Sequence, residues 1–391
     1  MDRRTFNQRL GLGMALPIFN PSTATPSPPD DLKITNISTF RVHRGIFIKI
    51  ETNMGVTGWG ESSPNSTEVI ETFIHHTMKE LLIGENPFNN ELIWDTLFWT
   101  NHDLGPAGAL PYAVAGVDLA LWDIKGKLLK QPVYTILGGK YRDRMKAYGG
   151  FGVKGGNVSV DEAVRRATNL AEKGFQVIKL RMQIRENNLN PDPDPTLKYY
   201  EAIRKALPEN VELFVDPNEG YTAYKAIQIG KALQDMGMKH FESPCPLENP
   251  DDTAEVTKAL DIPVLAGEKA YTRWQFRDLI MRANPDMIQP DLIKAGGITE
   301  VKKIATLGQT FFKDLVLHNT KPSLGTAAAM HLMASVSNAG PFIEFIETEI
   351  YEEVMSIFEN HVPFKDGYLH VPEGHGLGLV INENRLNKIA R

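Results

Sequence analysis

The 391-residue sequence predicts an α/β fold, a (β/α)8 barrel of the TIM type with an N-terminal α+β capping domain. Two observations predict the barrel. Past Arg144, short apolar strands alternate strictly with amphipathic helices. From Asp216 onward, polar residues at the expected strand ends recur at steps of 26, 26, 23, 27 and 26 residues, by subtraction of the residue numbers. Before Arg144 the strands come first and the helices follow, which indicates a separate domain at 31–144 ahead of a barrel at 145–350.

The first 30 residues are expected to stand outside this fold. Arg3-Arg4 precedes a short, mildly apolar stretch, and a linker rich in Pro, Ser and Thr follows. A twin-arginine pair before a weak apolar region is typical of a Tat export signal, which predicts a periplasmic or exported protein. If the pair is a chance feature of a basic N-terminus, we expect a cytoplasmic protein instead.

The capping domain is expected to begin with a small antiparallel sheet. Residues 34–42 and 46–52 are rich in β-formers, and 55–61 follows a turn. Helical spacing of apolar residues then predicts helices at 66–82 and 113–129. The second is rich in apolar and small residues, so we expect it to be buried.

The barrel strands are predicted at 145–148, 176–180, 211–215, 239–242, 263–266, 287–289, 315–318 and 342–345. Helices are predicted between them, among others at 161–173, 196–207, 223–236 and 299–307. The C-terminal ends of all strands in such a barrel lie on one face, which carries the active site. The tail at 351–391 has no barrel period and is expected to return to the capping domain.

Asp216, Glu242 and Glu268 end three successive strands. Three adjacent carboxylates repel one another unless a cation lies among them. Hard oxygen ligands without Cys or His favour Mg²⁺ or a similar ion, so the sequence predicts a metal site. The alternative is that these are solvated loop acids, or partners of Lys269 and Arg273.

His318 and Asp291 end neighbouring strands. A carboxylate on one imidazole nitrogen fixes the tautomer and raises the basicity of the other nitrogen, so the pair predicts a general base. The alternative is a structural histidine bonded to a loop carbonyl. His43 and His102 belong to the capping domain, and either could reach over the site.

Lys179 ends the second strand, across the barrel from that pair. A partly desolvated lysine beside a cation has a lowered pKa and could take or give a proton. Arg181 points the same way two residues on, and because arginine stays protonated we expect an electrostatic role for it. Glu344 ends the eighth strand and could hydrogen-bond a substrate carboxylate if it is protonated; alternatively it pairs with a lysine. Cys245 is expected to be buried.

The composition excludes several classes of partner. A net charge of −6 argues against the basic surface that nucleic-acid binding needs. No apolar run reaches the ~18–20 residues that a membrane span needs. With a single cysteine, the chain has no intramolecular disulfide and no cysteine-based metal cage.

Taken together, these motifs resemble the mandelate racemase subgroup of the enolase superfamily over about residues 32–379. The resemblance is carried by Gly58-Trp59-Gly60-Glu61, Leu137-Gly138-Gly139, Asp216-x-Asn218, Glu242, Ala266-Gly267-Glu268, Gln289-Pro290-Asp291, Ala295-Gly296-Gly297-Ile298 and His318-Asn319. It implies a Mg²⁺ cofactor at Asp216, Glu242 and Glu268, and a His318–Asp291 dyad as general base. It also implies Lys-x-Lys at the end of the second strand, where this chain has Lys179-x-Arg181. A second departure is His375-Gly376, which stands where Pro-Gly is usual.

The resemblance implies a Mg²⁺-dependent hydro-lyase that acts on a small acid-sugar carboxylate, in a homo-oligomer. In the scheme of this superfamily, the proton alpha to the carboxylate leaves to give an enediolate. His318 would remove that proton and the β-hydroxyl would leave, giving a 2-keto-3-deoxy acid. The proton for the departing hydroxyl would come from His318 on the same face or from Lys179 on the other face, with Arg181, Glu344 and Asn218 binding substrate.

Two other functions stay open. One is an isomerase on the same intermediate, either a cycloisomerase or a racemase. Arg181 disfavours the racemase because arginine is a poor base. The other is an acid-sugar-binding protein without catalysis, which the complete dyad and acid triad disfavour.

Overall fold

In the computed structural model, which describes residues 31–183, 189–346 and 351–391, the chain begins with a three-stranded antiparallel sheet. Its strands are β1 (Ile34–Val42), β2 (Gly45–Thr52) and β3 (Thr57–Ser62), joined in that order. The three predicted strands are therefore confirmed. The predicted Tat signal lies outside the described residues.

Helix α5 (Ala109–Leu129) packs on this sheet at unusually short range. A Cβ atom on Gly60 of β3 would lie 1.9 Å from the carbonyl oxygen of Gly116, and one on Gly58 would lie 2.2 Å from that of Ala120. Only glycine permits this backbone contact. The predicted helix at 66–82 is present as α2 (Thr67–Phe73), the π-helix η1 (Ile74–Met78) and α3 (Lys79–Leu82). The sequence did not predict α4 (Asn90–Asn101) or η2 (His102–Leu104).

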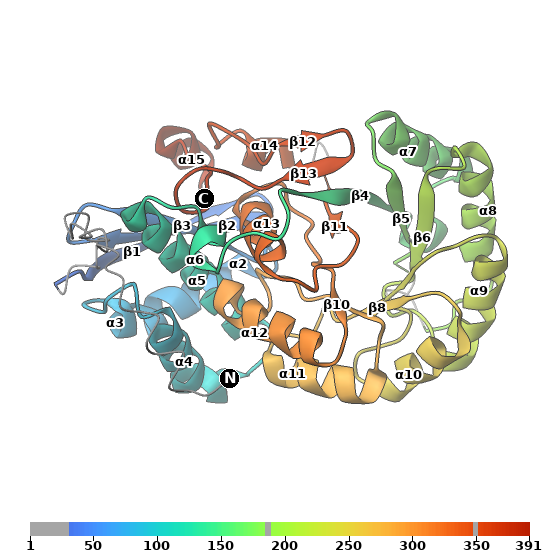
Figure 1. The fold of residues 1–391 in the computed structure, drawn as a ribbon, viewed down its shortest axis with the longest axis horizontal. Helices are drawn as coiled ribbons and strands as arrows, with labels where there is room; N and C mark the ends of the chain where they lie inside the picture. The colour runs from blue at the N-terminus through green and yellow to red at the C-terminus, as the bar shows by residue number, and fades with distance from the viewer. Residues whose placement is uncertain (1–30, 184–188, 347–350) are drawn as a thin grey trace, which may run out of the picture. The chain divides into compact units, whose positions relative to one another are not determined.

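Eight parallel strands form the barrel (Figure 1). They are β4 (Arg144–Gly152), β5 (Val177–Arg181), β6 (Glu212–Asp216), β7 (Phe241–Glu242), β8 (Val264–Ala266), β9 (Met287–Ile288), β10 (Asp314–Leu315) and β11 (Ile343–Glu344). Neighbours in the chain pair from β4 to β10, and β11 pairs with β4. A parallel bridge between Leu315 and Ala339 closes the ring. The (β/α)8 barrel with an N-terminal cap is therefore confirmed.

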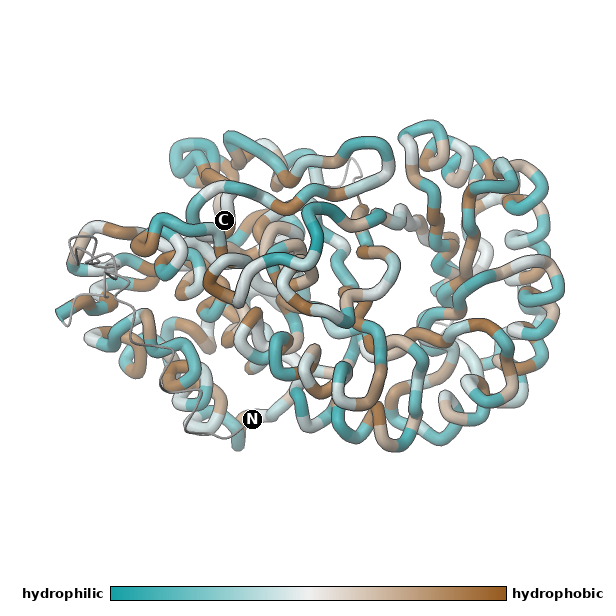
Figure 2. The backbone as a smooth tube through the Cα atoms, in the orientation of Figure 1, coloured by the Kyte–Doolittle hydropathy of each residue, from teal (hydrophilic) through white to brown (hydrophobic). Residues whose placement is uncertain are grey.

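The barrel helices alternate with these strands. They are α7 (Val160–Glu172), α8 (Thr196–Ala206), α9 (Ala223–Asp235), α10 (Pro250–Ala259), α11 (Arg273–Asp278) continued by the π-helix η4 (Leu279–Ala283), α12 (Gly297–Thr310) and α13 (Leu324–Ser335). Hydrophilic and hydrophobic residues alternate along the helices (Figure 2), and buried hydrophobic residues from the strands and helices belong to one core cluster. The first helix described after β11 is the four-residue α14 (Glu352–Met355).

The C-terminal segment touches both the barrel and the cap. Strands β12 (Phe364–Lys365) and β13 (Tyr368–His370) form a hairpin, and β13 pairs antiparallel with the start of β4. Farther on, the Leu377 N–H donates to Oδ1 of Asp123 on α5 at 3.0 Å. Helix α15 (Glu383–Ile389) follows and contacts β1. The domain limits 31–144, 145–350 and 351–391 stay predictions.

Buried polar contacts fix the cap against the barrel. Oε2 of Glu61 on β3 accepts hydrogen bonds from the Ser323 hydroxyl at 2.5 Å and the Gly325 N–H at 2.8 Å, at the start of α13. Oδ2 of Asp118 on α5 accepts from the Thr299 N–H at 3.0 Å. Both contacts place cap carboxylates at the N-terminal ends of barrel helices, where free N–H groups favour negative charge.

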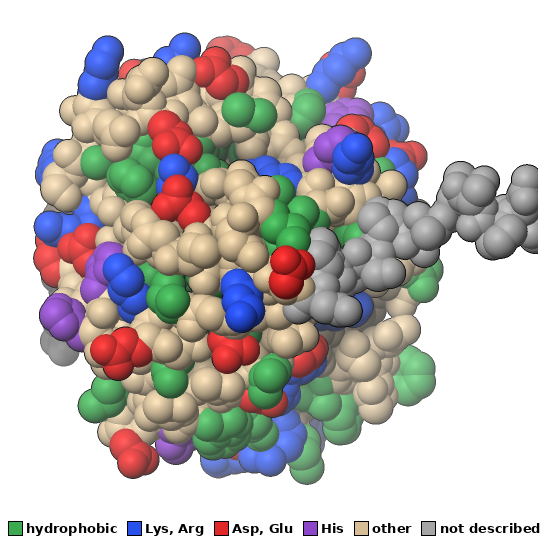
Figure 3. All heavy atoms as spheres, turned by 90° about the vertical axis from the view of Figure 1, so that its left-hand side faces the viewer, with side chains coloured by type: hydrophobic (Ala, Val, Ile, Leu, Met, Phe, Trp, Pro, Cys, Tyr) green, Lys and Arg blue, Asp and Glu red, His purple; other side chains and the backbone are tan. Residues whose placement is uncertain are grey.

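The surface side chains of one face are mixed in type. Lysine and arginine alternate with aspartate and glutamate over the face drawn in Figure 3. Among the described residues, no helix combines the length and the apolar character needed to cross a membrane.

Candidate active site

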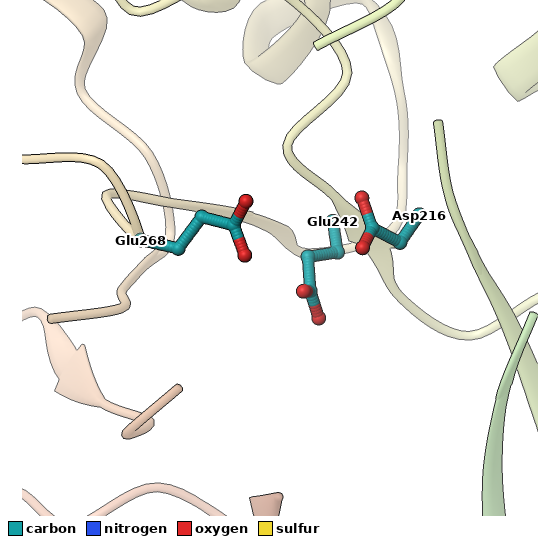
Figure 4. A group of neighbouring side chains, drawn as sticks. All are labelled: Asp216, Glu242 and Glu268. Carbon is teal, nitrogen blue, oxygen red and sulfur yellow. The ribbon is translucent and has the colours of Figure 1, made fainter. Parts of the chain in front are cut away.

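Three acids approach one another from the ends of neighbouring strands (Figure 4). Asp216 ends β6, Glu242 ends β7, and Glu268 lies two residues past β8. All are buried, and their ligand oxygens lie within 4.8 Å of one another. Burial raises the pKa of Glu242 to about 8, and it also raises the pKa of Asp216. The three predicted acids therefore lie together, and burial disfavours their charged forms.

The donor set fits a hard divalent cation. It consists of carboxylate oxygens alone, which Mg²⁺ and Ca²⁺ prefer. Two buried oxygens, Oδ2 of Asp216 and Oε2 of Glu242, make no hydrogen bond with any of the residues that the structure describes. Unpaired buried carboxylate oxygens are unfavourable unless a cation binds them. The residues present thus match the cofactor that the sequence predicts.

Lys179 lies beside the triad, buried on β5. Its Nζ is 2.6 Å from Oε1 of Glu242, 2.8 Å from Oε1 of Glu344 and 3.6 Å from Oδ2 of Asp216. Burial lowers the pKa of Lys179, but the charges of Glu242 and Glu344 outweigh it and hold the pKa well above its usual value. This is opposite to the expected lowering, because carboxylates surround the ammonium group. The surrounding carboxylates therefore favour the ammonium form of Lys179.

His318 and Asp291 form the expected pair. Nδ1 of His318 lies 2.7 Å from Oδ2 of Asp291, and a parallel bridge joins the two residues. The other nitrogen, Nε2, lies 3.0 Å from Oε2 of Glu268. Burial lowers the pKa of His318, as does Lys294, but Glu344, Glu268 and Asp291 outweigh them and raise it to about 9. The strands β9 and β10 end three residues before Asp291 and His318. The two segments therefore stay side by side beyond the ends of their strands.

Glu344 pairs with Lys179, which was the alternative interpretation of this residue. The Asn319 N–H also donates to its Oε2 at 3.0 Å. Burial raises the pKa of Glu344, but Lys179 and His318 outweigh burial and the pKa lies below its usual value. Two neighbouring cationic groups thus favour the charged form of Glu344, whereas a hydrogen bond donated to a substrate carboxylate would need the protonated form.

Arg181 and Asn218 occupy different places. Arg181 lines the cavity with Lys179, and its Nε lies 3.7 Å from Oδ2 of Asp216. Asn218 does not line the cavity. Its side-chain amide donates to Oε1 of Glu268 at 2.8 Å, and its N–H donates to Oδ1 of Asp216 at 2.7 Å. Asn218 thus orients two of the triad carboxylates.

A cavity of about 780 Å³ opens beside these residues. Its walls come from the cap, through Arg44 and Tyr112, as well as from the barrel loops. His43 and His102 do not line it, so neither reaches over the site as was considered. His102 packs instead against the rings of Phe98 and Trp99.

The sequence analysis missed two lysines that line this cavity, Lys294 and Lys321. Nζ of Lys294 lies 3.1 Å from Oδ2 of Asp291, the same oxygen that His318 contacts. Both lysines lie three residues beyond a dyad member, at Asp291 and His318. They were missed because they lie in loops past the strand ends, where the ladder spacing gives no signal.

Cys245 is buried, as expected. Burial raises the pKa of its thiol, which disfavours the reactive thiolate form.

Comparison with known families gives two matches that together span most of the chain. Residues 21–138 match the family described as mandelate racemase / muconate lactonizing enzyme, N-terminal domain. Residues 162–385 match the family described as enolase C-terminal domain-like.

Individual proteins match over almost their whole length. A D-galactonate dehydratase from Variovorax paradoxus is 32% identical over 92% of this chain and 95% of its own. A D-galactarolactone cycloisomerase from Agrobacterium fabrum is 30% identical over 88% of this chain and 90% of its own. The crystal structure of a mandelate racemase/muconate lactonizing protein from Paracoccus denitrificans, complexed with magnesium, is similar with a TM-score of 0.87. It is 31% identical and covers 92% of this chain and 97% of its own.

Proposed function

The chain belongs to the mandelate racemase / muconate lactonizing enzyme family of the enolase superfamily, and from this we propose that it is a Mg²⁺-dependent acid-sugar dehydratase. The reaction would remove the proton alpha to a carboxylate and eliminate the β-hydroxyl as water. The product would be a 2-keto-3-deoxy acid. The dehydratase from Variovorax paradoxus, which shares this architecture, supports the class of reaction.

We assign Asp216, Glu242 and Glu268 as the residues that hold Mg²⁺. Their convergence supports the assignment, as do the two buried oxygens that make no hydrogen bond with the described residues. A bound divalent cation would supply positive charge that stabilises the negative charge developing on the substrate carboxylate. Asn218 keeps two of the carboxylates oriented through its hydrogen bonds to Asp216 and Glu268.

His318 is the general base in this proposal. Nδ1 is committed to Asp291, so the proton of the substrate would be taken by Nε2, which faces Glu268 and the cavity. The contact of Nδ1 with Asp291 stabilises the imidazolium that forms, so His318 can hold the abstracted proton and deliver it to the departing hydroxyl. Asp291 fixes the tautomer that leaves Nε2 free to accept.

The observation that carries the proposal is the pair of cationic side chains across the barrel from His318. Nζ of Lys179 lies within ion-pair distance of Glu242, Glu344 and Asp216, which favours its ammonium form, and the guanidinium of Arg181 stays protonated. An elimination needs one base and one acid, whereas racemisation needs a base on each side of the reacting carbon. His318 is one base, and the side chains across from it are cations and not a second base. This arrangement therefore supports elimination.

A cycloisomerase is the second candidate. The similarity to the D-galactarolactone cycloisomerase favours it, because one base and one acid also suffice to expel a ring oxygen. The mass of the product separates the two candidates. Purified protein with Mg²⁺ would be incubated with aldonic, aldaric and anhydro acids, and the products analysed by mass spectrometry. Loss of water is expected; an unchanged mass would replace the dehydratase by an isomerase, and no conversion of any acid would contradict both.

Two further expectations complete the proposal. We infer a homo-oligomer from the family resemblance, with no nucleic-acid partner. We also infer export through the twin-arginine segment at Arg3-Arg4. Size-exclusion chromatography with light scattering tests the first inference, and fractionation of the source cells tests the second.

A further inference from the structure

One buried cation in the cavity wall has no ion-pair partner among the described residues. Lys321 lies in the loop between β10 and α13 and is only 2% exposed, yet it lines the cavity. Within the described part of the chain, its Nζ makes no hydrogen bond and no carboxylate comes within ion-pair distance of it. The other buried lysines of the same wall differ in this respect, because Lys179 pairs with Glu242 and Lys294 pairs with Asp291. A buried ammonium without a partner is strongly unfavourable.

The acids that act on Lys321 do so only from beyond ion-pair distance. Asp291 and Glu61 act on Lys321 through their charges, but neither comes within 4 Å of it. Asp291 is bound by His318 and Lys294, and Oε2 of Glu61 is bound at the start of α13. Burial is the largest influence on the pKa of Lys321 and lowers it. The protein therefore leaves this amine facing the cavity without neutralising it.

A second cation without an ion-pair partner among the described residues lines the same cavity. It is Arg44, which stands in the β1–β2 turn of the cap with a positive φ of 62°. Burial raises the pKa of the Tyr351 phenol, while Thr320 and the charge of Arg44 lower it. Thr320 and Tyr351 also line the cavity. Cap and barrel thus each contribute one cation to this wall.

We propose that Lys321 and Arg44 form a second anion-binding subsite, and that the substrate is an acid sugar with a carboxylate at each end. The inference rests on the proposed function, in which the triad takes the first carboxylate. A terminal carboxylate at Lys321 would supply the missing counter-ion and the hydrogen-bond acceptors that the amine lacks. An uncharged terminal CH₂OH would leave the buried ammonium unpaired, so the subsite discriminates between the two.

The test compares six-carbon acid sugars in pairs that differ only at C6. Galactonate and galactarate form one pair, and gluconate and glucarate form another. For the wild type, we expect kcat/KM to be at least about 100-fold higher for the better diacid than for its monoacid partner. In Lys321→Met, kcat/KM for that diacid should fall about 100-fold, while activity on the monoacid changes by less than about threefold. Arg44→Gln should act in the same direction with a smaller loss, because Arg44 is exposed.

Thermal unfolding checks that the variant is folded and tests the unpaired charge directly. Because methionine removes a buried charge without a partner, Lys321→Met should keep or raise Tm in the absence of substrate. The matched control is Lys198→Met on the outer helix α8, where the side chain is exposed and activity on both acids should stay unchanged.

Each contrary result has a distinct meaning. Equal losses on both acids together with a lowered Tm would make Lys321 a structural partner of Glu61 and overturn the subsite. A wild type that prefers monoacids would overturn it as well. Conversion of a diacid without loss of water would contradict the dehydratase but keep the subsite. If no acid is converted and calorimetry detects no Lys321-dependent binding of galactarate, both the dehydratase and the subsite are contradicted.

Discussion

His318 can accept a proton only through Nε2, because Nδ1 is held by Asp291 at 2.7 Å. We expect His318→Asn to lower kcat by about 10²–10⁴-fold, the usual contribution of a general base. Exchange of the α-proton with deuterated solvent should be lost to the same degree, since it reports the abstraction step alone. NMR of the recovered substrate measures this exchange.

The control for this change is His76→Asn. His76 is exposed on the cap helix and should leave both kcat and exchange unaltered. If His318→Asn retained full exchange, another group would have to be the base. If it lost kcat but kept exchange, His318 would serve only the departure of the hydroxyl.

Single residues also show which parts of the site the sequence could predict. Asp216, Glu242, Glu268, Asp291 and His318 were found because strand ends recur at nearly constant steps and all meet on one face. Contacts between loops follow no period. The spacing of strand ends does not determine side-chain directions. It therefore could not predict that Lys179 pairs with Glu344 or that Lys321 faces the cavity.

At the scale of elements, helix α13 is held by a carboxylate from another domain. Glu61 on β3 binds the Ser323 hydroxyl and the Gly325 N–H at its first turn. We expect Glu61→Ala to destabilise the protein by about 2–4 kcal/mol, because it leaves two buried donors unpaired. Thermal unfolding would detect this loss as a lowered Tm. Glu80→Ala on the exposed face of α3 should change stability by less than about 0.5 kcal/mol; an equally small effect of Glu61→Ala would show that water replaces the carboxylate.

The same helix makes stability depend on pH through His331, whose Nδ1 accepts from the Tyr134 N–H at 3.3 Å. Burial lowers the pKa of His331 to about 4, whereas the unfolded chain titrates near 6.5. Between these values only the unfolded state binds the proton. The contribution is therefore complete above pH 6.5 and is lost as the pH falls toward 4.

The expected result is a steeper loss of Tm between pH 6.5 and 4 in the wild type than in His331→Asn. Asparagine can still accept the Tyr134 N–H but does not titrate. His361→Asn, at an exposed position, should follow the wild type. Parallel curves for His331→Asn and the wild type would mean that the pH dependence arises elsewhere.

Elements differ in how well their residues predicted them. The cap strands and α5 were predicted because their apolar runs are long. Helix α4 was missed, although Ile93, Trp94, Leu97 and Phe98 are buried at helical spacing and carried the signal. The early end of β10 could not be predicted, because the apolar residues Val316 and Leu317 continue past its last residue, Leu315.

For the whole molecule, the metal site links cofactor binding to global stability. A ligand that binds only the folded state stabilises it by about 2.7 kcal/mol at 100 times its Kd. We therefore expect Mg²⁺ to raise Tm by a few degrees and EDTA to reverse the shift and abolish activity. Asp216→Asn should remove the Mg²⁺-dependent shift, because it deletes one charged ligand.

The matched control for this experiment is Asp261→Asn, on the loop after α10. Its side chain bonds only Gln234, far along the chain from the triad. It should retain the full shift. A Mg²⁺ response in Asp216→Asn equal to that of the wild type would move the cation away from this triad.

The return of the C-terminal segment has a consequence for the order of folding. Leu377 bonds Asp123 of α5 across 254 positions of the chain, and Glu61 bonds Ser323 across 262. The cap emerges first from the ribosome, yet its contacts with Ser323 and Leu377 can form only when nearly the entire polypeptide has been synthesised. Contacts of such long sequence separation close slowly, so the nascent cap must wait with part of its apolar surface uncovered. The cap is therefore the first domain to be synthesised and the last to complete its contacts.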